Sequence, residues 1–224
     1  MFKQIFIILF LFGFFSHLTS QTLSASEIFK NVVHSVVKVY GIDFEGIDFK
    51  QGSGVVIDSN VIATNYHNFD ECKGLRVVHF DKRFDDIKIL YANPQEDILI
   101  LFVRNLRLKP IKTADSTNIL IGDKIFAIGS PKDFENTITE GIISGIRQGN
   151  KSIQISAGIT HGSSGGAVVN ERGELIGISS SGIEQTNINL NFAIPIYLIN
   201  KLNWCNVKAK NCQNANYYYC MLYN

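Results

Sequence analysis

The chain has 224 residues, 46% of them hydrophobic and 18% charged, which is enough apolar sequence to bury a core as one all-β domain or as two small barrels. This composition excludes a chain that is disordered throughout. The formal net charge is only +1, from 21 basic and 20 acidic residues, and no dense run of Lys or Arg occurs, so nucleic acid is not an expected partner.

The first 20 residues have the layout of a secretory signal peptide. Lys3 precedes an apolar run over Ile5–Phe15, and small polar residues follow it. The run is shorter than the roughly 20 residues that a membrane-spanning helix needs. We expect residues 1–20 to be cleaved off near Ser20 and the mature protein to be secreted or periplasmic. An uncleaved anchor is the alternative, and only that form would contact a membrane.

A short helix is expected at each end of the folded part. Ser24 stands three residues before Glu27, a capping-box pattern that predicts a helix over Glu27–Val32, and IYLINKLN predicts a closing helix. The segments between them are short and rich in β-branched and aromatic residues, and Gly, Asn, Asp and Pro separate them. This pattern predicts an all-β sandwich or pair of barrels. The polar stretch around Leu108–Asn118 divides the strands into two sets, so we expect an internal boundary there.

The sequence HGSSGG over residues 161–166 is the main candidate for chemistry. Glycine and serine are typical of turns, so a plain turn between two strands is one interpretation. The other is a nucleophile, because this stretch fits the pattern Gly-x-Ser-x-Gly, in which a serine on a tight turn is free of neighbouring side chains. Ser164 is the expected nucleophile, and Ser163 is its competitor.

A serine nucleophile needs a base that takes its proton and an acid that holds the base. Among the five histidines, His67 is the best candidate for the base, because VIATNYHNF ends a strand and places it at the start of a loop. His34 and His79 are expected to be structural, and His161 lies on the turn of the serine itself. Asp97 is the expected acid, since it opens the apolar strand DILILFV, where a buried carboxylate needs a partner.

The order of these residues separates folds that share such a triad. An α/β-hydrolase is excluded, because its histidine follows the serine and no histidine follows His161. The subtilisin order needs an acid before His67, which three aspartates could supply, but it also needs long helices that this β-rich sequence lacks. Among the folds considered, the one that remains has antiparallel barrels and the triad order His67, Asp97, Ser164.

Several collinear segments carry a resemblance to a known family: GSGVVI, VIATNYH with His67, EDILILFV with Asp97, IGDKIFAIGSP, TITEGIISGI, HGSSGGAVVN, GELIGISSSG and NFAIP. From about Ile28 to Leu202 the chain resembles the protease domain of the HtrA/DegP-type branch of chymotrypsin-like serine proteases. The resemblance implies two six-stranded antiparallel β-barrels with the triad in the cleft between them.

The resemblance also implies the division of the chain. We expect a trypsin-like protease domain over 21–202, with the first barrel at about 33–108 and the second at about 119–195. The PDZ domain that usually follows in this family is not expected. The Cys- and Tyr-rich tail over 203–224 is unlike the family and is expected to form a strap on the protein's own surface, with an aromatic docking site as the alternative. Asn68 replaces the apolar residue that is common after the histidine.

The expected roles follow from the chemistry of the triad. Ser164 attacks the scissile carbonyl, His67 accepts and returns the proton, and Asp97 orients the imidazolium. The backbone N–H groups of Gly162 and Ser164 are expected to form an oxyanion hole. No metal and no cofactor are expected.

Four cysteines in an exported chain predict two disulfides. They are Cys72, Cys205, Cys212 and Cys220. Zinc binding is the weaker interpretation, because the sequence contains no C-x-x-C and no histidine pair. Three connectivities are possible, and at least one tail cysteine is expected to reach Cys72.

Aligned outward from Ser164, the resemblance to this family implies a set of uncharged residues around the substrate pocket. They are Gly158, Ile159 and Thr160 on one wall, His161 at the mouth, Ser179, Ser180, Ser181 and Gly182 on the opposite wall, and Asn191 near the base. A basic P1 side chain is not expected, because no carboxylate would meet it. A small or medium aliphatic P1 residue is predicted, because Ile159 should shorten the pocket. An acidic P1 paired with His161 is the runner-up.

Three classes of function stay open. The predicted one is a secreted serine endopeptidase that cleaves mainly unfolded polypeptides. The alternatives are a protease-like module that binds without cleaving and a serine esterase on the same fold. The complete triad argues against the silent module. The sequence predicts no oligomeric state.

Overall fold

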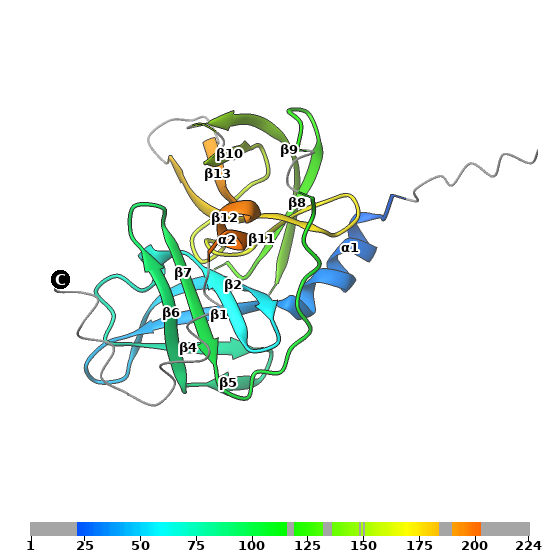
Figure 1. Cartoon of the computed structure of the whole chain (residues 1–224). Helices are drawn as coiled ribbons and strands as arrows, with labels where there is room; N and C mark the ends of the chain where they lie inside the picture. Colours follow the sequence, from blue (N-terminus) through cyan, green and yellow to red (C-terminus); the bar gives the residue numbers. More distant parts are fainter. Residues whose placement is uncertain are drawn as a thin grey trace, which may run out of the picture.

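Two antiparallel β-sheets, each built from one half of the chain, make up most of the structure (Figure 1). The computed structural model describes residues 22–115, 119–131, 136–147, 149, 151–183 and 190–202, with the backbone only for 181–183. The predicted signal peptide and the tail over 203–224 therefore lie outside the described residues.

The first half contains α1 (Ala25–Val32), the 3₁₀ turns η1 (Val33–Ser35) and η2 (Tyr66–Asn68), and the strands β1 (Val36–Ile42), β2 (Asp48–Asp58), β3 (Val61–Thr64), β4 (Gly74–His79), β5 (Lys82–Phe84), β6 (Ile87–Asn93) and β7 (Ile98–Val103). The second half contains the strands β8 (Lys124–Gly129), β9 (Thr137–Arg147), β10 (Ser152–Ile155), β11 (Ala167–Asn170), β12 (Leu175–Ile183) and β13 (Leu190–Pro195), followed by α2 (Ile196–Asn200).

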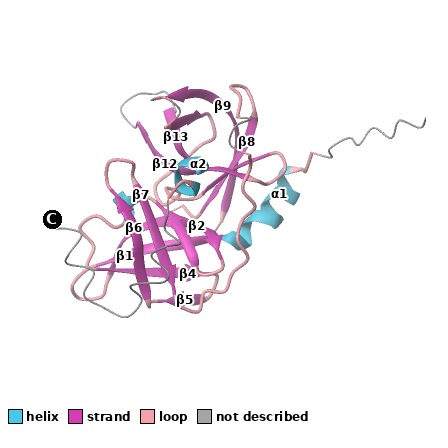
Figure 2. Ribbon diagram, in the orientation of Figure 1, coloured by secondary structure: helices cyan, strands magenta, loops and turns pink. Residues whose placement is uncertain are grey.

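The all-β prediction with two barrel-like sheets is confirmed (Figure 2). The second half forms a closed barrel in the order β10-β13-β12-β11-β8-β9. The first half differs from the expected six strands: it is a 7-stranded sheet in the order β5-β4-β1-β2-β3-β7-β6. The additional strand is β5, a three-residue segment that pairs with the end of β4 through Val77 and Phe84. The polar stretch between β7 and β8 joins the two sheets.

The predicted N-terminal helix is present and begins slightly earlier than expected. Ser24 is its N-cap: the hydroxyl accepts a hydrogen bond from Glu27 N at 3.3 Å, and the Glu27 carboxylate accepts one from Ser24 N at 2.9 Å. Because the cap is Ser24 itself, the helix starts at Ala25. Its buried face presents Ile28 and Val32 to the core.

Side-chain alternation along the strands divides the core into three apolar clusters. On β7, Leu99, Leu101 and Val103 face the interior of the first sheet, whereas Ile98 and Ile100 face a cluster shared by both sheets. Alternate residues of a strand point to opposite faces, so a strand that is buried on both sides must be apolar throughout. This explains the uninterrupted apolar run in DILILFV.

The shared cluster also takes in both helices. Ile28 of α1 and Ile196 and Ile199 of α2 are fully buried in it together with residues of both sheets. In Figure 1, α2 lies where the two sheets meet. Because this junction is packed as a core, the two sheets form one rigid support for whatever lies along their common edge.

Cys72 is a free thiol in the structure, in contrast to the expected disulfide. Its Sγ lies 3.6 Å from the carbonyl oxygens of Asn68 and Asp70, and a Cβ atom placed on Gly41 would stand only 2.1 Å from it. Burial is the main cause that raises the pKa of this thiol to about 11. The sulfur thus faces the interior of the first sheet. The three tail cysteines lie outside the described residues, and a bond among them stays a prediction.

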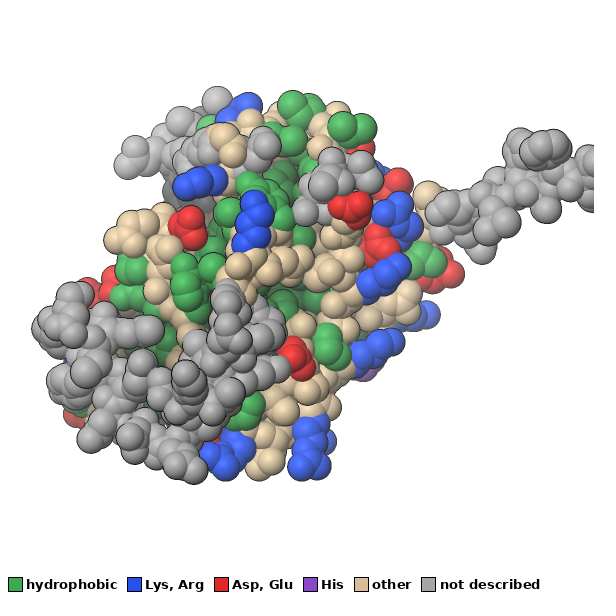
Figure 3. All heavy atoms as spheres, viewed as in Figure 1, with side chains coloured by type: hydrophobic (Ala, Val, Ile, Leu, Met, Phe, Trp, Pro, Cys, Tyr) green, Lys and Arg blue, Asp and Glu red, His purple; other side chains and the backbone are tan. Residues whose placement is uncertain are grey.

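The visible surface carries charges of both signs. Basic and acidic side chains are interspersed along the edge beside α1 in Figure 3, and apolar side chains lie between the sheets and over the second barrel. No helix in the described ranges is long and apolar enough to cross a membrane.

Candidate active site

The topology of the first sheet brings His67 and Asp97 together. β3 and β7 are antiparallel neighbours, and Thr64 at the end of β3 pairs with Leu99 near the start of β7. His67 lies in η2 directly after β3, and Asp97 directly precedes β7. Two residues that are 30 positions apart therefore meet at one edge of the sheet.

The Asp97 carboxylate holds His67 at two points. His67 Nδ1 lies 2.9 Å from Oδ2 and 3.1 Å from Oδ1, and the backbone N–H of His67 donates to Oδ1 at 3.0 Å. The Asp97 carbonyl accepts a further hydrogen bond from Tyr66 N at 3.2 Å. Asp97 has a φ of +55°, a left-handed conformation that is uncommon for residues other than glycine and often marks functional positions. These contacts fix the orientation of the imidazole ring.

Ser164 lies in a double turn that leads into β11. Ser163 N donates to Thr160 O at 2.9 Å, and Gly166 N donates to Ser163 O at 3.0 Å, so two four-residue turns follow each other. Their third residues are Gly162 and Gly165, with φ values of +88° and +87°. A type II turn requires a positive φ at its third position, which is why glycine stands there. The spacing of glycines in GSSGG is thus the spacing of these turns.

The turn with Ser164 is attached to the first sheet. The Ser164 carbonyl accepts a hydrogen bond from Ser53 N on β2 at 2.7 Å and a second from Asn68 Nδ2 at 3.2 Å. A Cβ atom on Gly165 would lie 2.1 Å from the Ser53 carbonyl, so only glycine permits this approach. The serine of the second barrel is thereby placed beside η2, the element that carries His67.

Ser53 is a site residue that the sequence analysis missed. It is fully buried, its Oγ donates to the Gly162 carbonyl at 2.8 Å, and the same Oγ accepts from Ser130 N at 2.9 Å. Its only mark in the sequence is a serine between two glycines in β2, and no local pattern names its partners. Among the described residues, no acceptor binds the N–H groups of Gly162 and Ser164.

Two of the predicted pocket serines have other contacts. The Ser180 hydroxyl donates to Asp97 Oδ2 at 3.2 Å and so supports the His67–Asp97 pair. Its place on the wall of a substrate pocket stays a prediction. The Ser179 side chain is buried, and its hydroxyl donates to the Ser163 carbonyl at 2.7 Å. Ser179 and Ser180 of β12 therefore support the turn of Ser164 and the His67–Asp97 pair from the side of the second barrel.

The other predicted pocket residues with described side chains lie in the turn, before it, or on β13. Ile159 is half-buried against the core of the second barrel, and Thr160 and His161 are exposed. Asn191 is buried, and its Nδ2 donates to a backbone carbonyl at 2.8 Å. Residues 181–182 continue β12, and their side-chain surroundings lie outside the described part.

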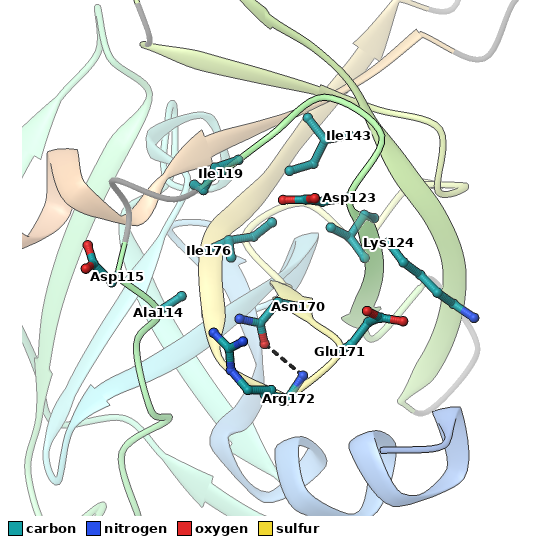
Figure 4. Close-up of a pocket in the computed structure, with 11 residues that line it drawn as sticks. Ala114, Asp115, Ile119, Asp123, Lys124, Ile143, Asn170, Glu171, Arg172 and Ile176 are labelled. Atoms are coloured by element: carbon teal, nitrogen blue, oxygen red, sulfur yellow. Dashed lines mark hydrogen bonds between the residues drawn. The ribbon is translucent and has the colours of Figure 1, made fainter. Parts of the chain in front are cut away.

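A separate pocket of about 210 Å³ lies at another end of the second barrel (Figure 4). Its lining combines apolar residues with charges of both signs: Ala114, Asp115, Ile119, Asp123, Lys124, Ile125, Ile143, Asn170, Glu171, Arg172 and Ile176. None of the predicted site residues belongs to this lining. It is distinct from the edge where His67, Asp97 and Ser164 gather.

Comparison with known proteins agrees with this geometry. Residues 52–178 match the family described as "Trypsin-like peptidase domain". Over 163 residues the chain is 37% identical to the "Periplasmic serine endoprotease DegP" of Salmonella typhimurium, which covers 67% of this chain and 34% of that protein. Over 168 residues it is 36% identical to a "Serine protease HtrA-like" of Staphylococcus haemolyticus, covering 65% of this chain and 26% of that protein.

A solved structure supports the same assignment. The crystal structure of the serine endoprotease from Yersinia pestis superposes with a TM-score of 0.74 at 28% sequence identity, covering 84% of this chain and 68% of that one. The chain spans about a third or less of the length of the two curated relatives. The fold and the resemblance predicted from the sequence are confirmed: the chain is similar to the DegP and HtrA-like serine proteases, and it belongs to the trypsin-like peptidase family.

Proposed function

We propose that this chain is a serine endopeptidase in which Ser164 is the nucleophile, His67 the general base and Asp97 the residue that orients the base. The observation that carries the proposal is the bidentate contact of His67 Nδ1 with Asp97, at 2.9 and 3.1 Å, next to the bound turn of Ser164. A proton held on Nδ1 by the carboxylate leaves Nε2 as the acceptor for the serine proton.

The reaction begins with acylation. Nε2 of His67 takes the proton of the Ser164 hydroxyl while Oγ forms a bond to the scissile carbonyl carbon, and the carbonyl electron pair moves onto oxygen. When this intermediate collapses, the C–N bond breaks and the imidazolium gives its proton to the leaving amine. Water then repeats the sequence on the acyl-enzyme, with His67 as base, and restores the Ser164 hydroxyl.

The N–H groups of Gly162 and Ser164 bind the oxyanion in this proposal. Type I and type II turns differ in the orientation of the central peptide, and the positive φ of Gly162 corresponds to the type II orientation. The hydrogen bond from Ser53 Oγ to the Gly162 carbonyl supports that arrangement from the first sheet. A donor of this kind is typically worth about 3 kcal/mol in the transition state.

The P1 preference is proposed to be a small or medium aliphatic side chain. Ile159 packs against the second barrel beside the nucleophile turn, and the amide of Asn191 is already bonded to a backbone carbonyl. A basic P1 group would lose water without gaining a carboxylate partner. An acidic P1 residue is the runner-up, because the exposed His161 adjoins Gly162.

We further propose that the enzyme acts outside the cytoplasm on unfolded polypeptides. The relatives named periplasmic endoproteases support the location, and the apolar N-terminal segment agrees with it. A protease that binds its substrate as an extended backbone favours unfolded chains, because their backbone groups are not already hydrogen-bonded within a fold.

The deciding experiment incubates the purified chain with a fluorophosphonate probe and, separately, with a permanently unfolded protein and with a small ester. Labelling of Ser164 together with cleavage of the unfolded protein is expected. Labelling with ester hydrolysis alone would favour the esterase, and absence of labelling would favour the silent binding module. A peptide-library cleavage profile tests the P1 preference, which a majority of Lys and Arg or of Asp and Glu would contradict.

A further inference from the structure

Asn68 is a buried polar residue at the point where the two sheets meet. It follows His67 in η2, and the residue is only 5% exposed. From the resemblance to the HtrA/DegP branch, an apolar residue is expected at this position, and Asn68 stands in its place. A buried amide in place of an apolar group requires hydrogen-bond partners, because an unpaired amide is costly to bury.

The partners of Asn68 are specific. Its Nδ2 donates to the carbonyl oxygen of Ser164 at 3.2 Å and to Thr64 Oγ1 at 3.2 Å. The Thr64 hydroxyl donates in turn to the Ser53 carbonyl at 2.6 Å, and Ser53 N donates to the Ser164 carbonyl at 2.7 Å. The four residues therefore form a closed ring of hydrogen bonds between η2, β3, β2 and the nucleophile turn.

The orientation of the amide follows from chemistry. A backbone carbonyl only accepts hydrogen bonds, so the side of the amide that faces Ser164 must be the NH₂ group. The side chain also has no room to turn away, because a Cβ atom on Gly52 would lie 2.2 Å from Nδ2. Asn68 is thus held in the one orientation in which it can donate to the nucleophile's main chain.

The bond is not needed to satisfy the Ser164 carbonyl. Ser53 N already donates to that oxygen at the shorter distance of 2.7 Å, so the Asn68 bond is a second one on the same acceptor. Its effect is geometric: the residue adjacent to the base is linked to the residue that carries the nucleophile. An error of about 1 Å in the relative placement of reacting groups can cost about 100-fold in rate.

We propose that Asn68 is a positioning residue that ties the main chain of Ser164 to η2 and so sets the distance between the serine hydroxyl and His67. The inference rests on the proposed function, because it assigns Ser164 and His67 their roles. Asn68 touches no substrate in this proposal and acts only through the turn of Ser164.

The test compares Asn68→Val, which restores an apolar residue, with Asn68→Asp, which has the same size but as a carboxylate cannot donate to a carbonyl. Titration of the active sites with a fluorophosphonate gives the concentration of folded, reactive enzyme in each sample, and kcat is calculated per titrated site. For both variants we expect kcat and the rate of fluorophosphonate labelling to fall about 10-fold to 100-fold, with KM changed by less than about twofold. For Asn68→Val the pH at half-maximal kcat/KM should stay that of the wild type, because the His67–Asp97 pair is untouched.

The control is Asn170→Ala, which removes the side-chain oxygen that accepts hydrogen bonds from Arg172 N and Glu174 N at 2.9 and 3.0 Å, in the turn after β11. It should lower the melting temperature but leave kcat per titrated site unchanged. Wild-type kcat retained by Asn68→Val, or by Asn68→Asp if the valine variant does not fold, would overturn the inference. A wild type without peptidase activity would instead refute the proposed function.

Discussion

The two turns at the ends of β11 are separated by only four residues, yet they are held in opposite ways. The turn before the strand carries Ser164, and neutral groups from the first sheet, Ser53 N and Asn68 Nδ2, bind its carbonyl. The turn after the strand is held locally around Glu174, a buried carboxylate bonded to Lys112, Asn170 and Arg172 at 2.5 to 3.0 Å.

The difference between these turns leads us to expect that catalysis and stability depend on different residues. The turn that carries Ser164 depends on residues about 100 positions away, so its geometry is a property of the assembled sheets. The distal turn depends mostly on neighbours within four positions, and charge supplies its stability. Changes in the first sheet should therefore alter rate, and changes around Glu174 should alter stability with little effect on rate.

The largest effect is expected for Ser164→Ala. Removal of the nucleophile should lower kcat about 10⁶-fold while the free energy of unfolding stays nearly the same, because only one half-exposed hydroxyl is lost. Initial rates on an unfolded protein and urea unfolding provide the two measurements. Ser163→Ala is the matched control and should stay active; the reverse pattern would assign the nucleophile to Ser163.

The second effect tests the long-range support of the catalytic turn. Ser53→Ala removes the hydroxyl that donates to Gly162 O and accepts from Ser130 N, so kcat should fall about 10-fold to 100-fold through a less well oriented oxyanion hole. Steady-state kinetics should show this loss with KM little changed. The exposed Ser59→Ala provides the comparison, and equal kinetics for the two variants would show that Ser53 does not support the hole.

The third effect concerns the distal turn. Glu174→Gln leaves Lys112 and Arg172 without their carboxylate, and the free energy of unfolding should fall by about 2 kcal/mol while kcat is retained. Urea unfolding of both proteins at neutral pH measures the change. The exposed pair of Lys124 and Glu140 at 3.0 Å is the control, because Glu140→Gln should cost less than about 1 kcal/mol. A large loss of kcat in Glu174→Gln would break the separation between the turns.

The smallest effect is the acid dependence of that turn. Burial raises the pKa of Glu174, but hydrogen bonds from Asn170, Lys112 and Arg172 outweigh it and bring the pKa to about 2, below the ordinary 4.5. A lowered pKa means that the carboxylate stabilises the fold fully above pH 4.5 and progressively less as the pH falls toward 2. Between pH 6 and pH 4 the loss should be about 1 kcal/mol.

The measurement is the difference in unfolding free energy between wild type and Glu174→Gln at the two pH values. The difference should shrink on acidification, because the charge that the glutamine lacks is being neutralised in the unfolded wild-type chain. A difference that does not change between pH 6 and pH 4 would show that Glu174 has an ordinary pKa.

The sequence by itself determined the features that depend on local rules. Alternation of side chains predicted strands, the Ser24 and Glu27 pair predicted the first helix, and the glycine spacing of GSSGG placed Ser164 in a turn. Chain order and the apolar run after Asp97 predicted that Asp97 pairs with His67. In the structure, His67 Nδ1 lies 2.9 Å from Asp97 Oδ2. These signals are readable because each is written within a few consecutive residues.

Only the tertiary structure decided which polar groups support the site. Ser53, Asn68 and Ser180 meet the nucleophile turn or Asp97 across 83 to 109 positions, and no local pattern specifies such a contact. The same reason explains why the contact of Ser180 with Asp97 was not predicted. The hydrogen-bond partners of these buried groups depend on how the two sheets pack, because donor and acceptor come within reach of each other only when the shared core has formed.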